Sequence, residues 1–180
     1  MQGVIYFVSG PPASGKTTFS ELLVQRFAKG LHIPVDDMRL WVKSGLADSV
    51  PWTEETERQF QIVEVATCAI AKIYLDQGFH VVVDHCRNPH RLEALISEQL
   101  PGCDVRKILL LPSLDVNLRR NAHRTDKPFP SRTLEETIRW THENYGESIP
   151  KDWTVVDNTA MSPQESIDFA MSEAKAQHSR

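Results

Sequence analysis

Residues 10–17 constrain the fold of this chain more than any other segment. They read Gly-Pro-Pro-Ala-Ser-Gly-Lys-Thr, a complete match to the pattern G-x-x-x-x-G-K-[ST]. An apolar run at residues 4–8 precedes them, and apolar side chains recur at helical spacing over residues 16–29 after them. In such a strand–loop–helix unit, glycines let successive backbone N–H groups face inward, and the helix N-terminus adds partial positive charge. The motif therefore predicts a phosphate-binding loop, of the Walker A type, at the end of a buried strand.

The rest of the chain alternates short apolar runs with helical patterns. We expect strands at residues 4–8, 31–35, 79–84, 105–111 and 153–157. We expect helices at residues 16–29, 36–45, 54–77, 89–99, 114–124, 133–145 and from 163 onward, the last two opened by capping boxes at Thr133 and Ser162. This alternation predicts an α/β fold of the P-loop NTPase class: a five-stranded open parallel sheet between helical layers, in one domain over residues 1–180.

Composition excludes several classes of protein. The 180 residues carry 20 Lys and Arg against 24 Asp and Glu, a net charge of −4, which excludes a strongly basic nucleic-acid-binding protein. No apolar run approaches the length of a membrane span, and the N-terminus lacks the features of a signal peptide. The three cysteines, Cys68, Cys86 and Cys103, indicate reduced thiols, and no Cys/His spacing resembles a zinc site. We therefore expect a cytoplasmic protein; the oligomeric state stays open.

The phosphate loop assigns the first set of functional residues. Lys16 is expected to contact the β- and γ-phosphates of a nucleoside triphosphate, and the Thr17 hydroxyl to hold Mg²⁺. The nucleotide-binding residues predicted here are Gly10, Pro11, Pro12, Ala13, Ser14, Gly15, Lys16, Thr17 and Thr18. A GTPase would also carry Asn-Lys-x-Asp, which is absent, and a motor ATPase core is normally longer than this chain. The predicted cofactors are ATP and Mg²⁺.

Two carboxylate sites follow predicted strands, at the sheet edge where ligands of such folds bind. Asp84 ends the third strand and is expected to help position Mg²⁺, although it could instead cap the turn at Asn88. His85 and Asn88 are candidate acceptor-binding residues or parts of a solvated loop. Cys86 lacks the partners expected of a nucleophile.

The second carboxylate site is Asp36-Asp37-Met38-Arg39, after the second strand. Asp36 is predicted to accept the proton of an attacking hydroxyl, and Asp37 to help bind the acceptor. Arg39 is predicted to orient the acceptor, since its guanidinium can bind a phosphate or carboxylate through two hydrogen bonds. The alternative is that one of the two aspartates only caps the helix.

A basic segment at residues 119–132 is predicted to form a lid that delivers cations to the transferring phosphoryl group. Arg120 and Arg124 lie one helical turn apart, and Arg124 is the better candidate to reach the γ-phosphate. A solvated basic surface is the alternative. Asn158, after the fifth strand, is a candidate to flank the adenine ring, with a plain turn as the alternative, and Trp52 is a candidate to stack on the acceptor.

Together these motifs carry a family resemblance that spans residues 4–158. The phosphate loop, Asp36-Asp37-Met38-Arg39, the strand ending in Asp84 and Arg120-Asn121-Ala122-His123-Arg124 resemble the small AAA-type P-loop kinases. These include the polynucleotide kinases, chloramphenicol phosphotransferase, gluconate kinase and the zeta-toxin-like kinases. The resemblance implies that Asp36 is the general base, Arg39 holds the acceptor and Arg124 stabilises the transferring phosphoryl group.

The sequence therefore predicts an ATP-dependent kinase that phosphorylates a hydroxyl group of a small molecule such as a sugar, nucleoside or antibiotic. A polynucleotide 5′-hydroxyl kinase is the first alternative. Such a kinase needs a positively charged channel for the strand, and the net charge of this chain is −4. An ATP-binding regulator that barely turns over is the second alternative, although such a protein would need only the phosphate loop.

Overall fold

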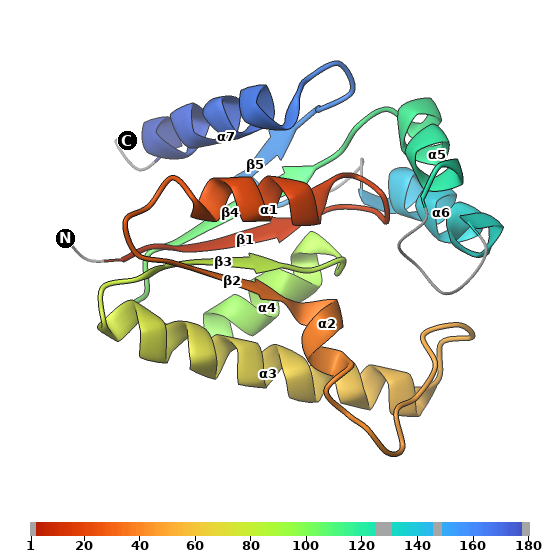
Figure 1. Ribbon diagram of the computed structural model, residues 1–180, viewed down its shortest axis with the longest axis horizontal. Coiled ribbons are helices and arrows are strands. Elements are labelled where there is room, and N and C mark those ends of the chain that lie inside the picture. The colour runs from red at the N-terminus through yellow and green to blue at the C-terminus, as the bar shows by residue number, and fades with distance from the viewer. Residues whose placement is uncertain (1–2, 125–130, 146–148, 178–180) are drawn as a thin grey trace.

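A five-stranded, all-parallel sheet forms the centre of the computed structural model, which describes residues 3–124, 131–145 and 149–177 (Figure 1). The strand order is β2-β3-β1-β4-β5. Its strands are β1 (Ile5–Ser9), β2 (Gly30–Pro34), β3 (His80–Asp84), β4 (Val105–Leu110) and β5 (Trp153–Val156). All five lie within a residue or so of the predicted positions, and the predicted α/β fold of P-loop type is confirmed.

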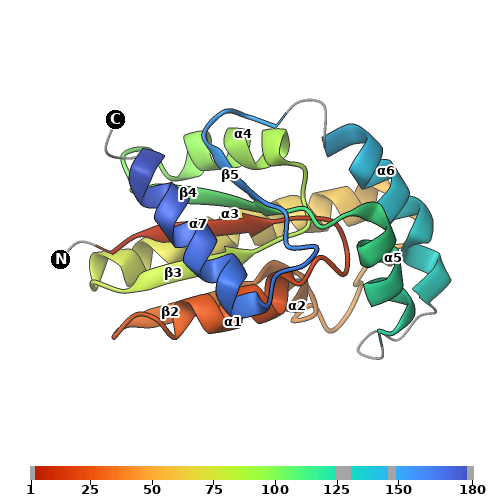
Figure 2. The same ribbon diagram turned by 90° about the horizontal axis from the view of Figure 1, so that it is seen from above.

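Helices cover both faces of this sheet. They are α1 (Lys16–Val24), α2 (Val35–Arg39), α3 (Glu54–Asp76), α4 (Pro89–Gln99), α5 (Leu114–Ala122), α6 (Glu135–Tyr145) and α7 (Pro163–Gln177), with a 3₁₀ turn at Ser131–Leu134. Helices α1 and α7 pack on one face, and α3 and α4 on the other (Figure 1). Figure 2 shows α5 and α6 side by side at the end of the molecule toward which the strands point. Polar residues at the strand ends therefore lie between the two layers and this helical pair.

Strand β1 shows why an unbroken apolar run specifies a central strand. All five of its residues are buried. Ile5 and Phe7 pack with the residues of α3 and α4, whereas Tyr6 and Val8 pack with those of α1 and α7. Because successive side chains point to opposite faces, a strand covered on both sides needs apolar residues at every position.

Two predicted helices end earlier than their apolar spacing suggested. Helix α1 stops at Val24 rather than at residue 29, because the chain reverses at once into β2. A Cβ on Gly30 would lie 2.5 Å from the Val24 side chain, so this close approach requires glycine. Helix α2 stops at Arg39 rather than at residue 45, and the Arg39 side chain donates to the Ala47 carbonyl of the returning loop.

Of the two capping boxes, one is confirmed and one is wrong. Ser162 and Glu165 exchange the expected bonds, with the Ser162 N–H donating to Glu165 Oε2 (2.7 Å) and the Glu165 N–H to Ser162 Oγ (3.2 Å). Thr133 instead lies inside the 3₁₀ turn, so its backbone is already wound and α6 begins only at Glu135. No helix in the described residues has the length and apolar composition needed to cross a bilayer.

Candidate active site

The phosphate loop curls directly off the end of β1. Gly10 has φ 152°, and a Cβ there would lie 2.4 Å from the Leu110 carbonyl oxygen and 2.6 Å from Ser14 Oγ. Ala13 and Gly15 also have positive φ, at 62° and 96°, and the Ser14 N–H donates to the Pro11 carbonyl at 3.2 Å. The curl that the motif predicted is therefore present, and Gly10 is required by close packing against β4 as well as by its dihedral angle.

Lys16 lies across this loop. Its ammonium donates to the carbonyl oxygens of Gly10 and Pro11, both at 3.0 Å. In this position the charge sits at the concave side of the loop, where it is available to a phosphate. The adjacent Thr17 is solvent-accessible, and its hydroxyl lies close enough to Asp84 to lower the pKa of that carboxyl.

Asp84 lies beside the loop because β3 pairs with β1, with Asp84 in register with Val8. Burial opposes ionisation of its carboxyl, but the hydrogen bond with His32 (3.3 Å), the charge of Lys16 and the nearby Thr17 hydroxyl outweigh burial, so the pKa of Asp84 lies below its ordinary value. The ionised carboxylate and the Thr17 hydroxyl are oxygen donors of the kind that Mg²⁺ prefers, and these residues fit the ion.

Side chains from two other elements hold the loop from behind. The Asn158 side-chain amide donates to the Ser14 carbonyl at 2.9 Å, and Arg120 donates to the Ser14 and Asn158 carbonyls at 3.4 and 2.9 Å. Burial lowers the pKa of Arg120, which remains a cation at neutral pH. Asn158 was predicted beside the nucleotide and Arg120 in the lid, and the structure places both against the phosphate loop.

The sequence did not single out a third support, from α5. The Asn117 side-chain amide donates to the Pro12 carbonyl at 2.7 Å, and His142 Nε2 lies 3.0 Å from Asn117 Oδ1. Asn117 and Asn121 are both buried on one face of α5, four residues apart, and a buried polar face of this kind was the available signal.

Asp36 and Asp37 occupy the first turn of α2 and are both solvent-accessible. The N-cap position belongs to Pro34, which makes no side-chain capping bond, so neither aspartate acts as the N-cap. The Cys86 thiol donates to Asp36 Oδ1 at 3.9 Å. Burial, reinforced by the charges of Asp36 and Asp84, raises the pKa of this thiol to about 12, although the positive charge of Lys16 opposes the rise. Asp36, Lys16 and Asp84 therefore lie near Cys86 at one edge of the sheet.

Arg39 is buried and makes its bonds within the chain. It donates to the Ala47 carbonyl (2.7 Å) and to Ser49 Oγ (2.8 Å), and its guanidinium lies 4.7 Å from the centre of the Phe60 ring. In this structure Arg39 fixes the loop at residues 40–53, and its predicted contact with an acceptor stays a prediction.

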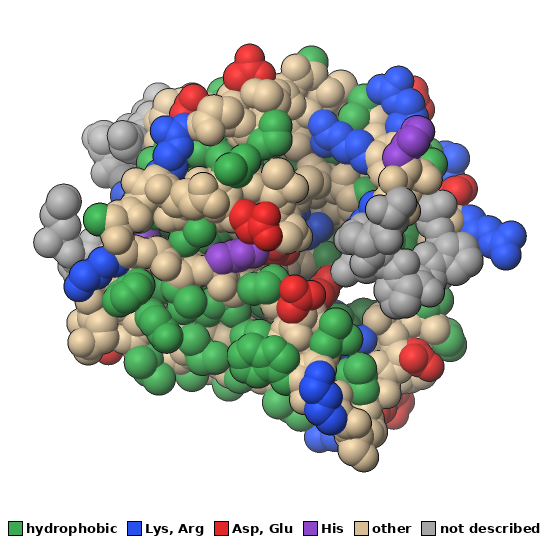
Figure 3. Space-filling model, in the orientation of Figure 1, with side chains coloured by type: hydrophobic (Ala, Val, Ile, Leu, Met, Phe, Trp, Pro, Cys, Tyr) green, Lys and Arg blue, Asp and Glu red, His purple; other side chains and the backbone are tan. Residues whose placement is uncertain are grey.

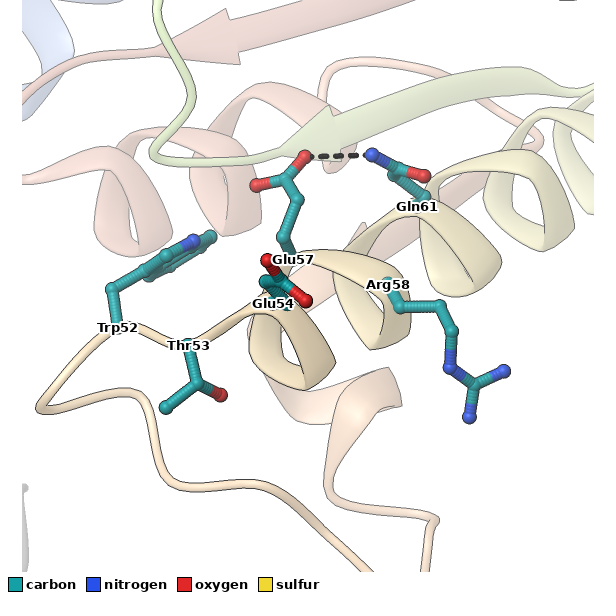
Figure 4. Close-up of a pocket in the computed structure, with 6 residues that line it drawn as sticks. All are labelled: Trp52, Thr53, Glu54, Glu57, Arg58 and Gln61. Atoms are coloured by element: carbon teal, nitrogen blue, oxygen red, sulfur yellow. Dashed lines mark hydrogen bonds between the residues drawn. The ribbon is translucent and has the colours of Figure 1, made fainter.

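Trp52 ends that loop and stacks on Phe60, with ring centres 5.0 Å apart. It is half exposed and borders a shallow pocket at the start of α3, together with Thr53, Glu54, Glu57, Arg58 and Gln61 (Figure 4). Asn88, by contrast, is the N-cap of α4, where its side chain accepts from the His90 N–H at 2.9 Å. The turn after β3 thus uses Asn88, and not Asp84, as its cap.

A buried charge network behind the turn after β3 was missed by the sequence reasoning. Glu64 is 2% exposed and accepts from Arg87 Nε at 2.7 Å, and His85 Nε2 lies 2.9 Å from the same oxygen. Arg87 also donates to both oxygens of Glu57, at 2.9 and 3.0 Å. The available signal was Glu64 itself, which falls on the face of α3 that carries Phe60 and Val63.

The predicted lid is described only in part. Arg120 contacts the phosphate loop, and the backbone N–H of Arg124 donates to the Asn121 carbonyl just beyond α5. Residues 125–130 lie outside the described residues, so the lid and the role of Arg124 in it stay predictions.

Comparison with known families decides the classification. Residues 5–147 match the family described as AAA domain. The chain belongs to this family. A comparison with curated proteins gives no match. The match covers the phosphate loop, both carboxylate sites and the described part of the predicted lid, so the resemblance seen in the sequence to AAA-type P-loop proteins is confirmed.

Solved structures of other members of this fold extend over nearly the whole chain. A sugar kinase from a Janibacter species has a TM-score of 0.69 at 18% identity, covering 94% of this chain and 93% of its own. A gluconokinase from Sinorhizobium meliloti has a TM-score of 0.64 at 21% identity, with coverage of 97% and 93%. The tunicamycin resistance protein of Deinococcus radiodurans has a TM-score of 0.66 at 15% identity, with coverage of 95% of each chain. At these identities the likeness establishes the fold of the small P-loop kinases.

Proposed function

We propose that this protein is an ATP- and Mg²⁺-dependent kinase that transfers the γ-phosphoryl group to a hydroxyl of a small-molecule acceptor. The observation that carries the proposal is the meeting of Lys16, Asp84 and Asp36 around Cys86. A protein that only binds ATP needs the phosphate loop, whereas a solvent-accessible carboxylate beside it serves transfer to a hydroxyl.

Each residue then has a chemical role. Lys16 and the loop N–H groups bind the β- and γ-phosphates, and Thr17 and Asp84 would hold Mg²⁺, which neutralises phosphate charge when bound. Asp36 accepts the proton of the attacking hydroxyl. Arg120 and Asn158 keep the loop in shape through the Ser14 carbonyl, and Arg124 is proposed to stabilise the charge that develops on the γ-phosphoryl group.

A small, uncharged or weakly charged acceptor suits the surface better than a nucleic-acid strand. On the face shown in Figure 3, positive and negative side chains of the described residues are interspersed, and hydrophobic side chains gather over α3. Two of the structures with this fold are named as a sugar kinase and a gluconokinase, which points to a polyhydroxylated acceptor. A half-exposed aromatic such as Trp52 suits stacking on a sugar or nucleoside ring.

The test is Mg²⁺-dependent ADP release, measured with sugars, nucleosides, antibiotics and 5′-hydroxyl oligonucleotides as acceptors. Asp36→Asn should reduce the turnover stimulated by the acceptor by at least about 100-fold, because general-base catalysis contributes about 10²–10⁴-fold. ATP affinity should stay unchanged. The matched control is Asp115→Asn, which neutralises an exposed carboxylate in the first turn of α5 instead.

Two outcomes would favour the alternatives. Stimulation only by oligonucleotides, falling steeply with salt, would indicate a polynucleotide kinase. A structure containing Pnkp1 has this fold over 71% of the present chain and 41% of its own, with a TM-score of 0.52 at 20% identity. Oligonucleotides are therefore tested among the acceptors. Tight ATP binding with no stimulated turnover, unchanged in Asp36→Asn, would indicate a regulator and overturn the general-base role.

A further inference from the structure

Three side chains with different donor atoms converge beside the proposed general base. The Asp36 carboxylate, a ring nitrogen of His85 and the Cys86 thiol all lie within 4.8 Å of one another. Asp36 comes from the start of α2, and His85 and Cys86 come from the turn after β3. Because β2 and β3 are neighbours in the sheet, the segments that follow them meet at the same edge.

His85 gives this cluster the features of a built site. The residue is 1% exposed, and its Nε2 faces the Glu64 carboxylate at 2.9 Å. Arg87 Nε donates to the same Glu64 oxygen, so that oxygen is an acceptor and Nε2 is the ring nitrogen that donates to it. The other nitrogen, Nδ1, is buried and has no hydrogen-bond partner among the described residues. A histidine whose far nitrogen is fixed by a carboxylate, leaving a lone pair on the near one, is the usual arrangement of a metal-binding histidine.

We propose that Asp36, His85 and Cys86 form a binding site for a borderline-soft divalent cation such as Zn²⁺, separate from the Mg²⁺ site at Thr17 and Asp84. One oxygen, one nitrogen and one sulfur donor suit Zn²⁺, whereas Mg²⁺ takes oxygen ligands almost exclusively. Three protein ligands leave a fourth tetrahedral position for water.

The spacing of the ligand atoms fits this assignment. Zinc–ligand bonds of about 2.0–2.3 Å place tetrahedral ligands about 3.3–3.8 Å apart. Cys86 Sγ and Asp36 Oδ1 are already 3.9 Å apart, and all three ligand atoms lie within 4.8 Å of one another. Side-chain shifts of about 1 Å therefore bring the three atoms to zinc-binding distances. Asp36 is solvent-accessible, which gives the ion a path to the buried His85 nitrogen. On binding, the Cys86 S–H bond breaks, a Zn–S bond forms and the proton passes to water.

The functional consequence rests on the proposed kinase activity. A carboxylate that ligates Zn²⁺ no longer accepts a proton from an acceptor hydroxyl, so occupancy of this site inhibits transfer. The ligands of the Mg²⁺ site are not involved, and ATP binding continues. Cys86 is the one of the three ligands whose substitution leaves the proposed general base and its histidine neighbour in place, so it is the residue to change when zinc sensitivity is tested.

Metal binding is tested first, without reference to activity. Free Zn²⁺ is set with a metal buffer, and alkylation of each cysteine by N-ethylmaleimide is followed by peptide mass spectrometry. Zinc should slow alkylation of Cys86 at least tenfold and leave the rate at Cys103 unchanged. Co²⁺ should give a thiolate charge-transfer band that is absent in Cys86→Ser and present in Cys103→Ser, the matched control at the other half-buried thiol. Equal Zn²⁺ affinity in Cys86→Ser and wild type, or unprotected Cys86, would overturn the site.

Inhibition is tested second, at fixed free Zn²⁺ with ATP and Mg²⁺ in excess. Wild type and Cys103→Ser should be inhibited alike, and Cys86→Ser, measured relative to its own zinc-free rate, should need at least tenfold more Zn²⁺ for half inhibition. Zinc bound through Cys86 without inhibition would show that Asp36 is not a ligand and refute the inhibitory role. A chain that binds Zn²⁺ as described but has no kinase activity would leave the metal site standing and refute the proposed function alone.

Discussion

Replacing Glu64 by Gln tests whether the buried charge network stabilises the fold. Glu64 lies on the inner face of α3, and its carboxylate contacts Arg87 Nε at 2.7 Å, His85 Nε2 at 2.9 Å and Arg91 at 3.9 Å. Glutamine has nearly the same shape, so the substitution opens no cavity; it removes the charge and replaces one acceptor oxygen by an NH2 donor. The Arg87 guanidinium, 15% exposed, then keeps Glu57 as its remaining anionic partner.

The expected loss follows from these contacts. Removing one partner of a buried ion pair costs about 3–5 kcal/mol, because the other charge is left buried without compensation. Glu57 still compensates Arg87 in part, so we expect a loss near the lower limit, about 3 kcal/mol. For a chain of this size each kcal/mol lowers Tm by about 2–4 °C, so the melting temperature should fall by about 6–12 °C.

Urea unfolding followed by circular dichroism and tryptophan fluorescence measures this loss, with coincident transitions as the check on two-state behaviour. The control is Glu55→Gln on the same helix, since Glu55 pairs with Arg58 at 2.8 Å but both side chains are exposed. Its urea midpoint should hardly move, because water screens such a pair. A Glu64→Gln midpoint equal to that of Glu55→Gln would refute the argument that burial gives this network its effect.

Three further predictions test other parts of the chain. Hydrogen bonds from His85 or Arg87 hold the pKa values of the Glu64 and Glu57 carboxyls below the ordinary 4.5 despite burial. The stability that these ionised groups contribute is complete above pH 4.5 and is lost as the pH falls through their lower pKa values in the folded protein. Tm should therefore decline below about pH 4.5, and less steeply in Glu64→Gln. Thr53→Ala removes the side-chain acceptor of the α3 capping box and should cost about 1 kcal/mol in urea unfolding; an unchanged midpoint would contradict the cap. Gly10→Ala forces a Cβ to within 2.4 Å of a β4 carbonyl and should weaken ATP binding at least tenfold by calorimetry, whereas wild-type affinity would show that the loop needs no glycine there.

The strands and the phosphate loop were predictable because local sequence determines them. A strand buried on both faces must be apolar throughout, as β1 is, and the loop needs glycine at fixed positions. The ends of α1 and α2 were not predictable, because contacts with the chain just beyond each helix decide them, and the start of α6 was not predictable because a 3₁₀ turn precedes it. Arg39, for example, reaches across to the Ala47 and Ser49 of the returning loop.

The candidate site divides in the same way. The positions of Asp84, Asp36 and Asn158 at one edge followed from the rule that parallel strands present their carboxyl ends together. The cluster of Asp36, His85 and Cys86 did not, since spacing rules for zinc sites compare ligands close in sequence. The strand order places β2 beside β3, and this adjacency brings together residues that are 49–50 positions apart.

The contacts also separate the loop proposed to bind the acceptor from the phosphate loop. Glu64 holds Arg87, whose guanidinium lies 5.0 Å from the centre of the Trp52 ring, and Trp52 ends the loop that Arg39 fixes. The phosphate loop is instead held by Arg120 and other residues on the opposite side of the site. Loss of the Glu64 charge should therefore raise the acceptor KM severalfold at temperatures where the protein stays folded, and leave ATP affinity within about twofold. If the affinities for the acceptor and for ATP fell equally, one rigid body would position both substrates. Trp52 and its loop would then have no separate role in choosing the acceptor.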